Sequence, residues 1–140
     1  MNSYRFSFLL ASLLAVGFSA SPAFAAKADK VEKLKSGVVI THLSKTNGGY
    51  PKATSNVTVN YRGTLKDGTE FDSSYKRKAP ISFELSRVIP CWTQGVQKMR
   101  IGEKAKLTCP GDTAYGSQGI PGVIPPNAEL TFEVELLAVQ

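Results

Sequence analysis

The chain has 140 residues and a formal net charge of +6, so it has room for one domain with a single core. The cations are scattered along the sequence, and it holds no RNA-binding or zinc-finger motif, which argues against nucleic acid as a partner. His42 is the single histidine. Metal sites need clustered ligands, so we expect neither a metal nor a cofactor.

The first 25 residues have the pattern of a secretory signal peptide. Residues 1–5 carry one positive charge, residues 6–18 are mostly apolar, and Ala23 and Ala25 stand at the small-residue positions before a cleavage site. The apolar run is shorter than the roughly 20 residues that cross a bilayer. We therefore expect removal after Ala25 and export rather than an integral membrane protein. The destination is the periplasm in a host with two membranes, or the medium where there is no outer membrane.

Residues 26–36 are polar and charged, and we expect them to form a flexible lead-in. A single domain then occupies residues 37–140. Apolar and polar residues alternate with period two in several of its segments, which predicts half-buried strands. These segments are residues 57–62, 70–71, 81–85, 104–109 and 130–136, with a weaker candidate at residues 38–43.

One segment has helical spacing instead. Trp92, Val96 and Met99 fall at i, i+4 and i+7, and Gly102 follows them, which predicts one short amphipathic helix. The pattern as a whole predicts an α+β fold, with a mostly antiparallel sheet covering that helix.

A loop rich in glycine and proline follows over residues 111–128. It contains Ile120, Val123 and Ile124. Apolar residues in such a loop pack on something or line a site.

The sequence offers no assembled nucleophile, because no Ser/His/Asp or Cys/His set can be built around His42. An enzyme without a nucleophile can still accelerate a reaction that breaks no bond, such as rotation about a peptide bond. The barrier is about 18–20 kcal/mol, and X–Pro bonds are the ones that populate cis appreciably. An apolar cavity favours the twisted amide, whose carbonyl oxygen carries less charge than that of the planar amide.

Several separated motifs resemble one known family. They are VNYRGTL at 59–65, FDSS at 71–74, VIPCW at 88–92, AYG at 114–116, GIPGVIPP at 119–126 and LTFEVELL at 130–137. Their order and spacing over residues 37–139 resemble the FKBP family of peptidyl-prolyl isomerases, the macrolide-binding immunophilins. The resemblance implies a half-open antiparallel sheet of about five strands wrapped around one short helix.

The resemblance also implies a site. Trp92 would form the pocket floor, and Phe71, Asp72 and Tyr115 would complete the catalytic set, with Asp72 at the rim beside Tyr61 or Arg77. The residues that would bind substrate are Tyr61, Ile81, Val88, Ile89, Ile120, Val123, Ile124 and Phe132, of which Ile120, Val123 and Ile124 would form a flap over the entrance. Ile81 replaces an aromatic residue that many members carry, and Ile120 replaces a histidine found in some, so the site is more aliphatic.

The expected partners are proline-containing polypeptides and macrolide inhibitors, and the expected state is a monomer. Catalysis of X–Pro isomerisation in exported proteins is the first hypothesis. A binding module or chaperone that holds apolar segments without turnover is the second.

The two cysteines, Cys91 and Cys109, leave two alternatives open. An exported protein permits a disulfide between them, and two buried free thiols remain equally compatible with the sequence. Cys91 precedes the pocket tryptophan, so a bond would lie beside the pocket floor.

Overall fold

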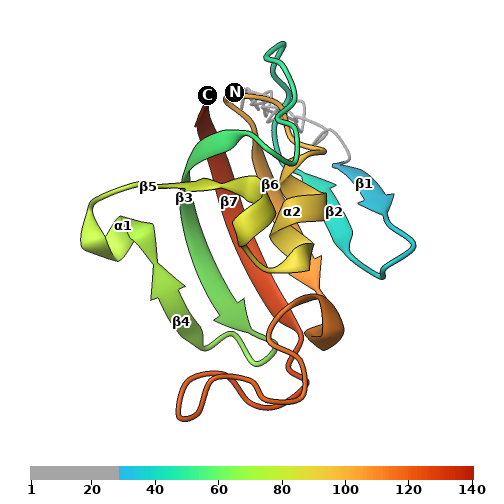
Figure 1. Ribbon diagram of the computed structural model, residues 1–140, viewed down its shortest axis with the longest axis vertical. Helices are drawn as coiled ribbons and strands as arrows, with labels where there is room; N and C mark the ends of the chain where they lie inside the picture. Colours follow the sequence, from blue (N-terminus) through green and yellow to red (C-terminus); the bar gives the residue numbers. More distant parts are fainter. Residues whose placement is uncertain (1–28) are drawn as a thin grey trace, which may run out of the picture.

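The computed structural model describes residues 29–140. One antiparallel sheet of seven strands forms its framework, and the main helix lies against one face of that sheet (Figure 1). The strands are β1 (Lys30–Lys33), β2 (Val39–His42), β3 (Asn56–Leu65), β4 (Glu70–Ser73), β5 (Ile81–Glu84), β6 (Lys104–Cys109) and β7 (Leu130–Val139). Their order is β1-β2-β6-β7-β3-β4, with β5 also paired to β3. The signal-peptide prediction lies outside the described residues.

The helical elements are short. They are α1 (Ser74–Arg77), the main helix α2 (Pro90–Val96), and single 3₁₀ turns over Leu85–Arg87 and Gly111–Thr113. Helix α2 begins at Pro90, where a proline is well tolerated. It ends at Val96, so Met99 lies beyond the helix but is still fully buried.

Helix α2 approaches the sheet closely because Gly95 faces β6. A Cβ atom at Gly95 would lie 2.9 Å from Leu107 Cδ2. Trp92 and Val96 bury one side of the helix in the same core as Leu107. The predicted amphipathic helix and all six predicted strand segments are therefore confirmed as elements of one core.

The flexible lead-in predicted for residues 26–36 is wrong where the structure describes it. Residues 30–33 form β1, which pairs with β2 in the register Val31↔Thr41. The Leu34 amide donates to the Val38 carbonyl oxygen at 2.8 Å and closes the turn between the two strands. Hydrogen bonds between the backbones of β1 and β2 hold this polar segment. Because its side chains do not alternate between apolar and polar, the sequence pattern did not predict a strand here. Strand β1 brings the sheet to seven strands, where about five were expected.

Among residues 29–140, no helix is long and apolar enough to cross a membrane. Within the same range, no group of three or more metal-binding side chains is placed to hold an ion.

Candidate active site

A cavity of about 470 Å³ opens between α2, β4, β5 and the segment that follows β6. Nine of the twelve predicted site residues line it: Tyr61, Phe71, Asp72, Ile81, Val88, Ile89, Trp92, Tyr115 and Phe132. They come from segments spread over more than 70 positions of the sequence, so the fold alone brings them together. The structure thus gathers the predicted floor, walls and rim around one space.

Aromatic rings build the cavity by edge-to-face contacts. The Trp92 ring lies 5.1 Å from the Tyr61 ring and 5.2 Å from the Phe132 ring, centroid to centroid, with interplanar angles of 84° and 90°. Phe71 meets Phe132 in the same way at 5.6 Å. Such T-shaped pairs are favourable because the positive ring edge faces the negative ring face. They hold the walls in fixed orientations before any ligand enters.

A glycine and a bulge place the Phe71 ring. The register between β3 and β4 shifts between Gly63 and Thr64, so Phe71 has no direct partner on β3. A bulge of this kind redirects a side chain. A Cβ atom at Gly63 would lie 2.6 Å from Phe71 Cζ, so the ring occupies space that another residue would fill. Phe71 and Asp72 can therefore line the same cavity although they are adjacent on one strand.

Three polar side chains form a closed network at the rim. The Tyr61 hydroxyl donates to Asp72 Oδ2, and Arg77 Nη1 donates to Asp72 Oδ1. Arg77 Nη2 also donates to the Tyr61 hydroxyl oxygen at 3.0 Å. Arg77 reaches the rim because α1 turns directly after β4, with Ser73 as its N-cap. Both partners that the sequence suggested for Asp72 are present.

The network sets the charge of each member. Burial alone would raise the pKa of Asp72, but the hydrogen bonds from Tyr61 and Arg77 and the guanidinium charge outweigh it and lower that pKa. Burial and the hydrogen bond to Asp72 raise the pKa of Tyr61. Burial, and then the Asp72 charge, raise the pKa of Tyr115. The rim therefore presents a carboxylate and two neutral phenols at neutral pH.

One backbone donor at the rim is free for a ligand. Ile89 is the N-cap of α2, and its carbonyl oxygen accepts from the Trp92 and Thr93 amides at 2.9 and 3.2 Å. Within the described residues its own amide makes no hydrogen bond. An apolar space with a few convergent polar groups is the usual form of a small ligand site.

The three apolar residues of the loop over 111–128, predicted as a flap over the entrance, are not among the residues that line this cavity, and their part in substrate binding stays a prediction. Ile124 is buried in the core at 3% exposure, Ile120 packs partly against it, and Val123 is 47% exposed. The pairing of Ile120 with Ile124 closes the loop on itself. Local backbone pairing thus turns these side chains to different sides, which composition alone could not reveal.

Three lining residues were missed from the sequence: Ser82, Phe83 and Arg87. Phe83 carried a usable signal, because it shares the strand face of Ile81 in the period-two pattern of β5. Its ring lies 5.4 Å from the Trp92 ring. Arg87 carried no such signal, since it comes from the single turn before α2.

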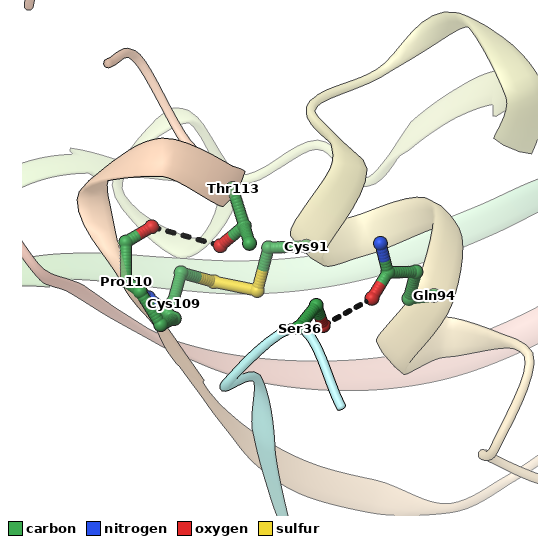
Figure 2. The surroundings of a disulfide bond; sticks show 6 residues. All are labelled: Ser36, Cys91, Gln94, Cys109, Pro110 and Thr113. Carbon is green, nitrogen blue, oxygen red and sulfur yellow. Dashed lines mark hydrogen bonds between the residues drawn. A yellow bond between two sulfur atoms is a disulfide. The ribbon is translucent and has the colours of Figure 1, made fainter. Parts of the chain in front are cut away.

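The disulfide adjoins the cavity floor. Cys91 and Cys109 are bonded, with a Cα–Cα distance of 5.6 Å (Figure 2). The bond joins the start of α2, one residue before Trp92, to the end of β6. Of the two alternatives left open for the cysteines, the structure contains the disulfide.

The chain is similar to known proteins. The family described as FKBP-type peptidyl-prolyl cis-trans isomerase matches residues 48–137. The peptidyl-prolyl cis-trans isomerase Fkbp12 of Drosophila melanogaster is 50% identical over 107 residues, which are 74% of this chain and 99% of that protein. The FKBP-type isomerase FkpA of Escherichia coli is 48% identical over 115 residues, which are 82% of this chain and 42% of FkpA.

Solved structures agree with the sequence matches. The crystal structure of Escherichia coli FkpA superposes with a TM-score of 0.75 at 47% identity, covering 79% of this chain and 51% of that one. A peptidyl-prolyl cis-trans isomerase from Pseudomonas syringae gives 0.74 at 41% identity, covering 79% and 80%. The chain thus spans about half of FkpA or less, but nearly all of the Drosophila protein.

Proposed function

Because the chain belongs to the FKBP-type peptidyl-prolyl cis-trans isomerase family, we propose that the aromatic cavity over Trp92 binds an X–Pro segment and accelerates its rotation. The observation that carries this proposal is the convergence of nine predicted residues on one cavity of about 470 Å³. No covalent step is involved, so the residues act by binding the twisted amide more tightly than the planar one.

The roles follow from the geometry. Trp92, Phe132 and Phe71 form an apolar seat for the proline ring. The free Ile89 amide is placed to bind a carbonyl oxygen of the substrate, and the Tyr115 hydroxyl stands at the rim as a second donor. Asp72 is held by Tyr61 and Arg77, so it orients the rim and its negative charge faces the rotating amide.

The test is a peptide isomerisation assay on a Leu-Pro peptide, followed by exchange NMR so that no protease is needed. The protein should accelerate exchange over the uncatalysed rate, which is slow because the barrier is about 18–20 kcal/mol. A macrolide that fills the cavity should inhibit the exchange and change the fluorescence of Trp92, the single tryptophan. Exchange at the uncatalysed rate would refute the proposal.

A second candidate function is that of a chaperone that binds apolar segments without turnover, and exposed apolar side chains favour it. Tyr115, which lines the cavity, is 39% exposed, and Val123 of the loop over 111–128 is 47% exposed. Suppression of aggregation of a proline-free client by a variant without isomerase activity would favour holding. Failure of the active protein to suppress that aggregation would favour isomerisation alone.

We further propose that the protein is exported and works as a monomer, in the periplasm of a host with two membranes. The signal-peptide pattern of residues 1–25 and the disulfide support export, because disulfides persist in oxidising compartments. Mass spectrometry of the exported protein should find Ala26 at the N-terminus. A cell-retained protein that keeps Met1 would contradict export.

A further inference from the structure

A second cavity, larger than the aromatic one, lies in another part of the molecule. Its volume is about 680 Å³, and it shares no lining residue with the isomerase cavity. Its walls are the start of β1 with Asp29 before it, the end of β2, the loop over residues 43–50 and the turn over residues 98–103. In Figure 1 the loop that contains these residues rises at the end of the sheet opposite the loop over 111–128.

The loop that forms one wall is held firmly although it has no regular secondary structure. The Thr46 hydroxyl donates to the Ile101 carbonyl oxygen at 2.7 Å, and the Ile101 amide donates to the Gly49 carbonyl oxygen at 3.0 Å. A Cβ atom at Gly48 would lie 2.5 Å from that Ile101 oxygen. The loop and the turn therefore touch backbone to backbone, and the cavity exists before a ligand arrives.

The carboxylate of Glu103, in the wall of the cavity, already has hydrogen-bond partners. Glu103 is 4% exposed, and its carboxylate accepts from His42 Nδ1 and from the Arg100 amide at 2.8 Å. His42 Nε2 in turn lies 3.4 Å from Glu32 Oε1. Glu103 thus supports the wall with a carboxylate that already has partners, and Asp29 at the edge of β1 is the other carboxylate in the lining.

The cationic side chains of the cavity have fewer hydrogen-bond partners than Glu103. Lys45 and Lys98 are exposed and line the cavity, and in the described part of the chain neither takes part in an ion pair. Arg100 donates to the Gly48 carbonyl oxygen at 3.0 Å and lies over the Tyr50 ring at 4.3 Å. A cation placed in this way is held in position and keeps donors for an anion.

Apolar surface lies beside these cations. Tyr50 is 53% exposed and Leu43 is 45% exposed, and both line the cavity. A fixed aromatic ring next to free ammonium groups suits a chain that carries both carboxylates and apolar side chains. Small anions would use the cations but not the ring.

We infer that this second cavity binds an acidic, aromatic-containing stretch of the polypeptide whose proline occupies the isomerase cavity. The inference rests on the proposed function, which makes the ligand of the protein a polypeptide. Two contacts on one chain raise the effective concentration of the proline at the first cavity. The second cavity would therefore lower KM for clients with an acidic stretch and leave kcat unchanged.

The test uses Leu-Pro peptides joined by Gly-Ser spacers of about 6, 12 and 18 residues to either Glu-Glu-Tyr-Glu-Glu or Gln-Gln-Tyr-Gln-Gln. At the best spacer length the acidic peptide should show a KM about 3- to 10-fold lower, since exposed ion pairs are individually weak. About 0.5 M salt should remove the difference, because it shortens the screening length.

The variant Lys45→Gln/Lys98→Gln should lose the preference and keep the turnover of the unextended peptide. The matched control is Lys33→Gln/Lys35→Gln, which removes two exposed charges that line neither cavity and should keep the preference. Equal KM values for the acidic and neutral extensions would overturn the inference. An equal loss in both double variants would overturn it too, because it would assign the effect to overall charge.

Fluorescence anisotropy with a labelled acidic peptide that lacks proline measures binding to the second cavity without a contribution from the isomerase cavity. Binding that is lost in Lys45→Gln/Lys98→Gln supports the inference even if no isomerase activity is found. Absence of binding overturns it. Tighter binding of a single-stranded oligonucleotide than of the acidic peptide would also overturn it.

Discussion

Asp72 is an ion held in place rather than a proton donor. Its carboxylate accepts from Tyr61 and Arg77, and these contacts lower its pKa below the ordinary value of 3.8 despite its partial burial. A lowered folded-state pKa stabilises the fold above the unfolded pKa, and this stabilisation is lost as the pH falls through the folded value. The rim network is therefore complete at neutral pH and fails in acid.

Isomerase activity should be flat between about pH 5 and pH 9, because Asp72 stays ionised and Tyr61 and Tyr115, with pKa values raised above 10.0, stay neutral. Activity should fall below pH 3.8 as Asp72 is protonated. Exchange NMR over this range checks it, with circular dichroism to separate unfolding. A bell-shaped profile centred near pH 7 would contradict it.

The position of the Phe71 ring in the cavity wall depends on the bulge between β3 and β4. Phe71→Ala should lower kcat/KM about fivefold, since removing an aromatic contact costs on the order of 1 kcal/mol and about 1.4 kcal/mol corresponds to a tenfold rate. Tyr75→Ala is the control, because Tyr75 is 49% exposed and lies outside both cavities. Equal effects of the two changes would show that the ring has no specific role.

At the scale of elements, the disulfide ties the pocket floor to the sheet. Cys91 and Cys109 are fully buried, and Cys91 is followed by Trp92. Beside the bond, the Ser36 hydroxyl donates to Gln94 Oε1 at 2.5 Å, which attaches the turn after β1 to α2 (Figure 2). The helix is thus fixed at Cys91 near its start and at Gln94 past its middle.

Removing the bond should therefore destabilise the protein. The bond spans 18 residues, so the loop-entropy account gives about 3 kcal/mol of unfolding free energy. Urea unfolding of the oxidised and the reduced protein measures the difference. Cys91→Ala/Cys109→Ala should resemble the reduced protein and should not respond to reductant. Two thiols that are alkylated in unfolded, unreduced protein would contradict the bond.

At the scale of the molecule, three of the exposed apolar side chains come from three separate elements. Val31 lies on β1, Tyr75 on α1 and Leu137 on β7. Single exposed apolar residues are ordinary on a monomer, whereas a stable interface buries a continuous patch. Sedimentation should give the mass of one chain across the micromolar range. A mass that rises with concentration would contradict the monomer.

The sequence by itself determined the kinds of element and the chemistry. Period-two alternation predicted the strands from residue 38 onward, because one strand face meets the core and the other meets water. The spacing of Trp92 and Val96 predicted the helix for the same reason. The missing nucleophile pointed to a reaction without covalent steps. The order of the motifs then assigned most of the cavity residues.

Only the tertiary structure decided what depends on register and on contacts between distant segments. It paired β1 with β2, turned Ile124 into the core, and closed the rim network between Tyr61, Asp72 and Arg77. It also assembled the second cavity from loops with no pattern of their own. Side-chain periodicity reports which face is buried, but backbone pairing and loop closure are fixed by partners far away in the chain.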